Sequence, residues 1–444
     1  MNLLYFAFDH LGEANCGRSL GEAVSPSSPF FYTDPALPYI HKVEVDFFKD
    51  RNMKFFYLIE PHAGLEHYLG LPVEDKRFSH SFLKYLPNLI KEKVDDGQCF
   101  IVITYMQEGH VDSQYIINLY EKLIKYNISP KQVIFVCANY KMKLVLNRLQ
   151  KKLPNLIKEK LHLITTDHLL EQMTRISNEY VEGWREQGYD GKSIDKRFDQ
   201  GINTPDEVRK TKNKLRPYKF LSFNRNMGKA HRPFLASLFL KENWIGNEGL
   251  VSVGPVFEMG GLLGWDNPEE VIQNKKYIEF LGSYPQKLKS MAPIFVDSDI
   301  INKQYDIWPG FQYPKTFNKV YLDVVNESTC SDESLFFTEK TYLAVSMLLP
   351  FIVLASSGAL KELRNIGFKT FSPFIDESYD EVENWEDRVM AVYESVKQFV
   401  AKPIEEIHDW YWDIYDDVLV HNWNILLNRK YVDHKNIYTY LAGL

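Results

Sequence analysis

The chain has few cysteines, and their spacing is not that of a metal site. Its 444 residues include four cysteines, which lie far apart, at Cys16, Cys99, Cys137 and Cys330. Zinc sites and the disulfides of small secreted domains both use closely spaced cysteines. Neither pattern occurs here, so we expect buried free thiols and a reducing compartment.

The chain also lacks an excess of positive charge and a targeting segment. The formal net charge is −7, so no overall basic field favours nucleic acid. The first apolar run meets Asp9 before it reaches signal-peptide length, and no basic segment precedes it. Residues 342–360 carry no charge, but Pro350 interrupts them, which favours a helix and a buried strand over a membrane span. We therefore expect a cytoplasmic protein without a membrane span.

No internal repeat or low-complexity tract interrupts the chain, and its length predicts two domains. In the first half, apolar runs alternate with helix-like segments. The expected strands are 3–8, 55–59, 99–104, 133–138 and 161–165, and the expected helices are 82–94, 113–126, 141–153 and 168–182. Apolar strands separated by helices predict a parallel sheet that is covered on both faces.

A second alternation follows a polar linker at 183–217, where we expect a hinge near residues 210–216. The expected strands are 218–223, 249–253, 292–296, 320–325, 351–354 and 368–371, and the expected helices begin near Arg232 and cover 269–280, 339–348, 359–366, 382–399 and 404–427. The fold class predicted is α/β, with two doubly wound, Rossmann-like domains. We expect domains at 1–205 and 206–403, followed by a helical tail at 404–444.

A polar segment follows the first strand of the second half, at a place where a phosphate would meet backbone amides. It contains Asn224 and Arg225, and then His231 and Arg232 at the start of the expected helix. Arginine binds two oxygens of a pyrophosphate through its planar guanidinium, and Gly228 would allow a close approach. The alternative interpretation is a solvated turn with surface arginines.

A second helix start carries Thr338, Glu339 and Lys340. A threonine cap with charged residues in the first turn gives a helix N-terminus that can hold an anion. Lys340 adds a positive charge, and Glu339 can accept hydrogen bonds from sugar hydroxyls. This combination suits a nucleotide diphosphate, and the alternative is an ordinary cap with an ionic first turn.

These residues resemble a known family. The donor-binding half of the α1,3-fucosyltransferases has a Glu-Asn-Ser triplet, a short spacer, an aromatic or aliphatic residue and then Thr/Ser-Glu-Lys. Here the triplet is transposed to Asn-Glu-Ser at 326–328, the spacer is longer, and Phe337 precedes the Thr-Glu-Lys motif. Arg232 takes the position of the family's arginine at a helix start. The resemblance covers about 219–380, under half of the chain.

The resemblance implies a GT-B glycosyltransferase with a nucleotide-diphosphate sugar as donor. The donor-binding residues that it implies are Asn224, Arg225, His231, Arg232, Glu327, Thr338, Glu339 and Lys340. In this architecture the tail helix crosses back to the first domain. The tail's aromatic residues also need a surface to pack on, and they are Trp410, Trp412, Tyr415 and Trp423.

The chain also resembles uncharacterised phage and marine bacterial glycosyltransferase-like proteins, through its FNR…HR, TEK and GFKTF…DESYD motifs. Some phage enzymes glycosylate modified DNA bases, so the expected acceptor is either a glycan or a hydroxymethylated base of double-stranded phage DNA. A basic segment in the first half would serve DNA binding, although a solvated helix face is the alternative. Its residues are Lys141, Lys143, Arg148, Lys151, Lys152, Lys158 and Lys160.

An inverting transfer needs a carboxylate or histidine that takes the proton of the acceptor hydroxyl. We expect this base in the first domain, at the carboxyl ends of its strands. The candidates are Asp9 and His10 after the first strand and Glu60 after the second, with Glu13 and Glu108 as further possibilities. Any of them is equally explained as a turn or cap residue.

Two acidic segments offer alternatives. Asp297 and Asp299 form an Asp-x-Asp motif after an apolar run, as in metal-dependent glycosyltransferases of another class. The flanking layout does not fit that class, so we expect that no metal is required. Segment 376–380 is also rich in carboxylates, and we expect it to form a turn in which Asp380 caps the next helix. A non-catalytic nucleotide- or sugar-binding module is the alternative to an enzyme.

Overall fold

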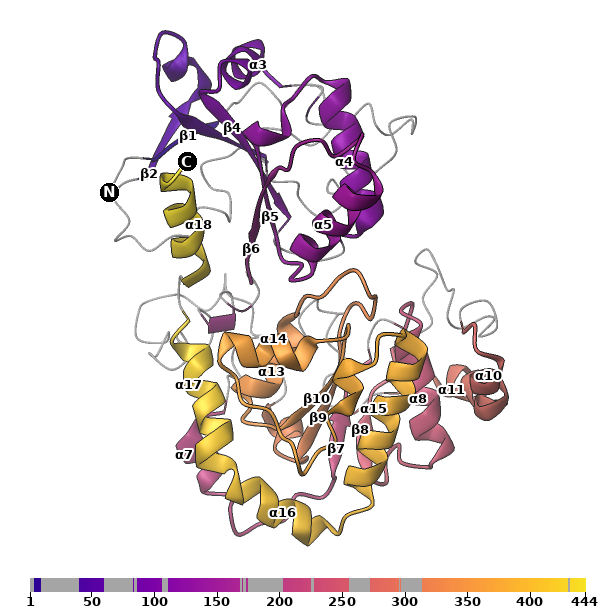
Figure 1. Cartoon of the computed structure of the whole chain (residues 1–444). Helices are drawn as coiled ribbons and strands as arrows, with labels where there is room; N and C mark the ends of the chain where they lie inside the picture. Colours follow the sequence, from indigo (N-terminus) through magenta and orange to yellow (C-terminus); the bar gives the residue numbers. More distant parts are fainter. Residues whose placement is uncertain are drawn as a thin grey trace. The chain divides into compact units, whose positions relative to one another are not determined.

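The structure is a computed structural model. It describes residues 4–8, 40–59, 83, 86–105, 111–167, 170, 173–174, 203–224, 227–254, 272–294, 296, 314–429 and 432–444. The chain divides into two compact units (Figure 1). Unit 1 comprises Met1–Glu171 and Tyr431–Leu444, and unit 2 comprises Gln172–Lys430. These limits differ from the expected boundaries at 205 and 403, and the acceptor and donor roles of the two parts stay predictions.

Unit 1 contains a six-stranded sheet in the order β2-β1-β3-β4-β5-β6, and all its strands are parallel. The strands are β1 (Leu4–Phe8), β2 (Ile40–Glu44), β3 (Phe55–Ile59), β4 (Cys99–Tyr105), β5 (Val133–Cys137) and β6 (His162–Thr165). The helical elements are η3 (Val45–Phe48), α3 (Asn88–Asp95), α4 (Ser113–Lys125), η6 (Pro130–Gln132), α5 (Met142–Lys152) and α18 (Val432–Ala442). Because β2 lies on one side of β1 and the later strands lie on the other, the direction of the crossovers reverses between β1 and β3.

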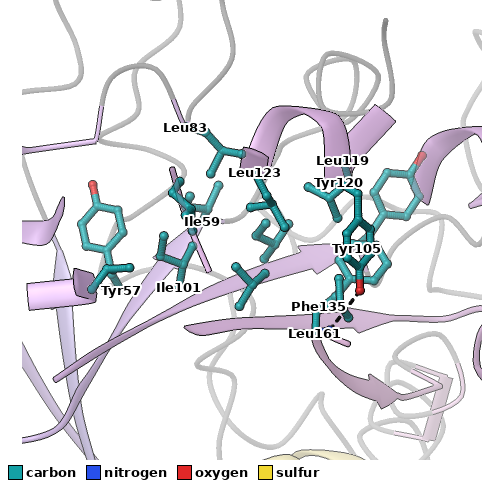
Figure 2. Packing of buried hydrophobic residues seen from close by; sticks show 14 of the residues in the cluster. Tyr57, Ile59, Leu83, Ile101, Tyr105, Leu119, Tyr120, Leu123, Phe135 and Leu161 are labelled. Atoms are coloured by element: carbon teal, nitrogen blue, oxygen red, sulfur yellow. Dashed lines mark hydrogen bonds between the residues drawn. The ribbon is translucent and has the colours of Figure 1, made fainter. Parts of the chain in front are cut away.

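The inner strands of unit 1, β1, β3, β4 and β5, are apolar on both faces. One face packs against the helices, as Figure 2 shows for Tyr57, Ile59 and Leu123. The hydroxyl of Tyr120 in α4 accepts a hydrogen bond from the amide of Leu161 at 3.1 Å, so this buried polar atom has a partner. Burial also raises the pKa of Tyr120 to about 12, which keeps the hydroxyl neutral.

The C-terminal helix α18 covers the opposite face of this sheet. Phe6 and Phe56 join Tyr438 and Leu441 in a second hydrophobic cluster. The rings of Phe6 and Tyr438 meet edge to face, with their centroids 6.3 Å apart. The chain therefore returns to unit 1 at its C-terminal end, as predicted.

Unit 2 contains a four-stranded parallel sheet in the order β10-β9-β7-β8. The strands are β7 (Phe220–Ser222), β8 (Gly249–Val251), β9 (Leu322–Asn326) and β10 (Phe351–Leu354). The helices before β10 are α7 (Pro205–Arg209), α8 (His231–Lys241), α10 (Lys275–Leu281), α11 (Tyr284–Met291), α12 (Pro314–Phe317) and α13 (Glu339–Ser346). After β10 come α14 (Ala359–Ile366), η11 (Ser378–Glu381), α15 (Trp385–Val400), α16 (Ile404–Asp413), the π-helical turn η12 (Tyr415–Val420) and α17 (His421–Leu427).

The connections in unit 2 run in opposite directions from the middle of the sheet. Helix α8 leads from β7 outward to β8, and α13 leads from β9 outward to β10. Since parallel crossovers are right-handed, α8 and α13 must cover opposite faces of the sheet. Figure 1 shows this arrangement, with α13 and α14 on one side of the strands and α8 and α15 on the other.

The aromatic tail packs within unit 2 before the chain reaches α18. The Trp410 ring stacks on Phe374 with centroids 4.2 Å apart, and the Tyr415 hydroxyl donates to the carbonyl of Pro205 at 2.8 Å. Trp423 Nε1 donates to the carbonyl of Asn203 at 3.1 Å. The four tail aromatics therefore do not form the crossover itself, which is made by α18.

The segment expected to act as a hinge is firmly anchored in unit 2. Arg216 is buried, with 5% of its surface exposed. Its backbone amide donates to the Tyr321 hydroxyl at 2.8 Å, and its Nη2 donates to the Tyr411 hydroxyl at 2.8 Å. Polar contacts therefore anchor the end of this segment, and the hinge stays a prediction.

The predicted α/β fold class, with two parallel sheets and a returning C-terminal helix, is confirmed. Strand β2 was not predicted, because its sequence IHKVE has little apolar character. Two expected strands are absent from the described residues. The expected strand at 292–296 forms a single antiparallel bridge, between Ile294 and Val253. In the expected strand at 368–371, the amide of Phe371 donates to the Glu377 carboxylate instead of to a neighbouring strand.

The described cysteines Cys99, Cys137 and Cys330 are free and buried, as expected. Burial raises the pKa of the Cys137 thiol to about 12, so this thiol is unreactive in the folded protein. Within the described ranges no helix is both long and apolar enough to cross a membrane.

The first prediction concerns Asp323 in β9. Its carboxyl group is buried, and burial raises its pKa well above the ordinary 3.8. Above pH 3.8 the unfolded state loses this proton and the folded state keeps it, so the group's contribution to stability falls as the pH rises. We expect the difference in unfolding free energy between Asp323→Asn and the unaltered protein to shift in favour of the variant from pH 5 to pH 8, as measured by urea unfolding. A stability difference that is the same at both pH values would contradict this.

Candidate functional site

The candidate site lies at the middle of the unit 2 sheet, where the crossovers reverse direction. Strands β7 and β9 are neighbours, with Phe220 beside Leu322 and Leu221 beside Asp323. Their carboxyl ends lead to the two helix starts that the sequence singled out, α8 and α13. In open parallel sheets this reversal leaves a crevice in which ligands bind.

The carboxyl ends of β7 and β9 are joined by buried amide side chains. Asn326 Nδ2 donates to Asn224 Oδ1 at 2.8 Å and to Ser222 Oγ at 3.0 Å. Asn224 and Asn326 are almost fully buried, with 0% and 1% of their surface exposed. Asn224, which was predicted to contact the donor, therefore holds the two strand ends together.

The first turn of α8 reaches across to the end of β9. His231 Nε2 lies 2.9 Å from the carbonyl oxygen of Glu327, and Arg232 Nη2 donates to the carbonyls of Asn326 and Glu327, each at 3.2 Å. Burial, followed by the charge of Arg232, lowers the pKa of His231 to about 3. The imidazole is therefore neutral, and its Nε2 carries the proton that it donates to the Glu327 carbonyl.

Glu327 is the centre of the site, and its carboxylate is fully buried. Oε1 accepts from the Thr338 amide at 3.0 Å and from Thr341 Oγ1 at 2.6 Å. Oε2 accepts from Thr338 Oγ1 at 2.5 Å and from the Ser328 amide at 3.3 Å. A carboxylate has about four acceptor positions, so the protein itself uses them all. Glu327 thus fixes the start of α13 to the end of β9.

Glu339 and Lys340 are the more accessible charges of the site. Their side chains keep 21% and 29% of their surface exposed, and they form an ion pair with Lys340 Nζ 2.9 Å from Glu339 Oε1. Lys340 Nζ also donates to Thr338 Oγ1 at 3.0 Å. Burial lowers the pKa of Arg232, and the carboxylates of Glu327 and Glu339 oppose that shift, so the charge at the start of α8 is coupled electrostatically to both carboxylates.

The neighbouring helix start, at α14, is closed by a protein carboxylate. Asp380 Oδ1 accepts from the Leu360 amide at 2.8 Å, and Oδ2 accepts from the Lys361 amide at 3.1 Å. Asp380 therefore caps the preceding helix α14 and not the following helix α15, which Asn384 caps instead. Asp380 was correctly predicted to cap a helix, but the prediction named the wrong helix, because the chain folds back along the sheet edge after α14.

Several predicted residues lie outside the described residues, namely Asp9, His10, Glu13, Glu60, Glu108, Arg225, Asp297 and Asp299. The strands that end just before the candidate bases, β1 and β3, are neighbours at the reversal point of the unit 1 sheet. No group of three or more histidine, cysteine or acidic residues within the described parts of the chain is arranged to hold a metal. The Asp-x-Asp alternative therefore stays untested.

The basic segment of unit 1 lies on α5 and the turn that follows it. Lys143, Lys151 and Lys152 are exposed, whereas Arg148 donates to Ser113 Oγ at 3.3 Å and Lys160 donates to Asn147 Oδ1 at 2.8 Å. This arrangement agrees with a solvated helix face.

Sequence reasoning identified the motif at α13 but did not find Thr341 or Ser222. Thr341 follows the Thr-Glu-Lys motif directly, and its hydroxyl faces the same carboxylate as Thr338 because α13 turns back over β9. Ser222 belongs to an apolar strand run, and only the pairing of β7 with β9 reveals its place beside Asn326.

Comparison with known proteins gives no family. No known family profile matches the chain, and no curated protein matches it. Among solved structures, an α,α-trehalose-phosphate synthase (UDP-forming) from Burkholderia vietnamiensis has a TM-score of 0.39 at 10% identity over 85% of this chain and 79% of that one. The S. aureus MnaA–UDP co-structure has a TM-score of 0.36 at 10% identity over 100% of this chain and 98% of that one.

The buried carboxylate of Glu327 generates the second prediction. Glu327→Gln replaces one carboxylate oxygen by an amide nitrogen, which would then face the N–H and O–H donors that now bond to Glu327. It also leaves the Arg232 charge without its buried counter-charge. Breaking such a buried charged network costs about 3–5 kcal/mol, which we expect to see as a lower free energy of unfolding in urea. The exposed Glu405→Gln serves as the control and should change stability by less than about 0.5 kcal/mol. Equal stability of the two variants would contradict the assignment.

Proposed function

We propose that the chain is a glycosyltransferase that moves a sugar from a nucleotide-diphosphate sugar to a hydroxyl acceptor. One observation carries the proposal: Glu327 and Arg232 couple two helix starts at the crossover reversal of a parallel sheet. Helix N-termini and nearby cations are suited to a diphosphate. The resemblance of the Thr-Glu-Lys motif to the α1,3-fucosyltransferases supports the same assignment.

In this proposal the partly exposed charges contact the donor and the buried charges hold them in place. Lys340 would bind the pyrophosphate, and Glu339 would accept hydrogen bonds from ribose hydroxyls. Arg232 would add its charge from beneath, which stabilises the diphosphate as it leaves with both electrons of the broken sugar–oxygen bond. Arg225 completes the set as a further cation for the phosphates.

The acceptor would be bound by residues 1–205, and its hydroxyl would lose a proton to a base there. Asp9, His10 and Glu60 are the candidate bases. The acceptor is a glycan or a hydroxymethylated DNA base, and DNA binding distinguishes the two. Binding to duplex DNA that weakens steeply with salt supports the DNA acceptor, whereas transfer to a saccharide with no DNA binding supports the glycan.

Turnover separates this proposal from a non-catalytic binding module. An enzyme releases nucleoside diphosphate from a nucleotide sugar, by transfer or by slow hydrolysis, and a binding module retains affinity without release. The measurement is liquid chromatography of a panel of nucleotide sugars after incubation with the protein. Affinity without any released diphosphate would favour the binding module.

The third prediction concerns Lys340. Lys340→Met removes a charged contact worth roughly 1.5–3 kcal/mol, so the dissociation constant of the nucleoside diphosphate should rise about tenfold to a hundredfold. Lys361→Met is the matched control, because Lys361 lies in the first turn of α14, where Asp380 already occupies the helix start. Isothermal titration calorimetry of both variants gives the comparison, and similar affinities in the two would remove the basis of the assignment.

The fourth prediction concerns metal. We expect EDTA to leave donor turnover largely intact, because cationic side chains take the role that a metal has in Asp-x-Asp enzymes. Activity that disappears with EDTA and returns with Mn²⁺ would instead favour Asp297 and Asp299 as metal ligands.

A further inference from the structure

A further buried arginine lies behind the site. Arg388, in the first turns of α15, has 0% of its surface exposed. Burying a guanidinium is costly unless its donors are satisfied, so its partners indicate what it does. They are mainly backbone carbonyls of two segments that are far apart in the sequence.

On one side, Arg388 Nη1 donates to the carbonyl of Glu383 at 2.9 Å and also contacts the carbonyl of Val382. On the other side, Nη2 donates to the carbonyl of Cys330 at 2.7 Å. The carboxylate of Asp332 lies 3.8 Å from Nη2. The guanidinium therefore bridges the start of α15 and the loop that follows β9.

That loop, residues 328–337, connects Glu327 to Thr338. Two other contacts hold it against the end of β10. Cys330 Sγ lies 3.2 Å from the carbonyl of Ala355, and Ser356 Oγ donates to the carbonyl of Ser334. The loop thus has fixed points within it, and Arg388 contributes a buried positive charge to one of them.

We propose that Arg388 is a positioning residue for the nucleotide site: it holds the Cys330 carbonyl and thereby fixes the path of the 328–337 loop into Thr338, Glu339 and Lys340. This inference rests on the proposed function. Arg388 itself contacts no ligand, because its side chain is fully buried. Its effect reaches the ligand through the place of the Thr-Glu-Lys motif.

The electrostatics of the site agree with this position. The charge of Arg388, after burial and the larger effect of Arg232, contributes to the lowered pKa of His231. Arg388 therefore lies near enough to influence the first turn of α8. Two buried guanidinium groups, Arg232 and Arg388, donate to carbonyls of the same stretch, Asn326 to Cys330.

The shape of the guanidinium explains why an arginine is needed. Its planar fork directs donors to Cys330 and to the α15 start at once, whereas a lysine ammonium is a point charge on a flexible stem. Arg388→Lys should therefore keep the charge and part of the bridge, and Arg388→Met should lose both.

Arg216 provides a matched control in the same unit. It is also buried, and it also donates to a backbone carbonyl, that of Val320, and to the Tyr411 hydroxyl. It precedes β7, at the amino end of the sheet, whereas Cys330 follows the carboxyl end of β9. Arg216→Met should therefore lower stability without changing the 328–337 loop.

The first measurement is the alkylation rate of Cys330 by iodoacetamide, read by peptide mass spectrometry. Cys330 is 7% exposed and belongs to the anchored loop. We expect Arg388→Met to raise this rate about tenfold, the change that corresponds to a loss of ~1.4 kcal/mol of local stability. Arg216→Met should leave the rate within about twofold of the unaltered protein. If the Met variants do not fold, Arg388→Lys and Arg216→Lys provide the same comparison.

The second measurement is the affinity for a panel of nucleoside diphosphates (UDP, GDP, CDP, ADP and dTDP) by calorimetry. We expect about tenfold weaker binding in Arg388→Met, partial recovery in Arg388→Lys, and no change in Arg216→Met. Three results would each overturn the inference. The Cys330 alkylation rate could be unchanged in Arg388→Met, or the Arg388 and Arg216 variants could have equal effects. The third result is a faster Cys330 rate in Arg388→Met with unchanged affinity. An unaltered protein that binds no diphosphate would count against the proposed function, and the Cys330 rates would still decide whether Arg388 anchors the loop.

Discussion

The site in unit 2 depends on one buried carboxylate. Glu327 has no solvent exposure and accepts hydrogen bonds from Thr338, Thr341 and Ser328. The contacts from Thr338 and Thr341 tie the start of α13 to the end of β9, while the carbonyl of Glu327 accepts from the first turn of α8. A buried charge is tolerated only when its hydrogen-bonding capacity is filled. The full set of donors around Glu327 therefore specifies one arrangement of the two helices.

The order of the strands places this carboxylate where it can join both helices. Because β7 and β9 are adjacent and their crossovers leave in opposite directions, α8 and α13 lie on opposite faces of the sheet. Their first turns meet only at the carboxyl ends of these two strands. A residue just after β9 is therefore within reach of both helix starts.

The sequence predicts the fold well because burial on both faces leaves a clear apolar pattern. Strand β10 and helix α14 have the predicted limits, and the predicted helix at 404–427 corresponds to α16, η12 and α17. The site is predicted less well, since a motif shows which charges are present and not which of them are buried. Glu327 and Glu339 are equivalent as sequence letters. Only the packing of α13 on β9 makes the first a structural anchor and leaves the second partly exposed.

Because of this difference in burial, the charges of the site have different roles. Arg232 and Glu327 are buried, with Arg232 bound to the Glu327 carbonyl and the Glu327 carboxylate bound to the start of α13. Glu339 and Lys340 keep part of their surface in water and are paired with each other, and solvent screening weakens such a partly exposed ion pair. In the proposed function an anion would compete with Glu339 for Lys340, and the released carboxylate would then become available to hydroxyl groups. Buried charges that fix the helix starts, and a partly exposed pair that can exchange partners, would explain why two charges of each sign occur at a site proposed for a sugar diphosphate.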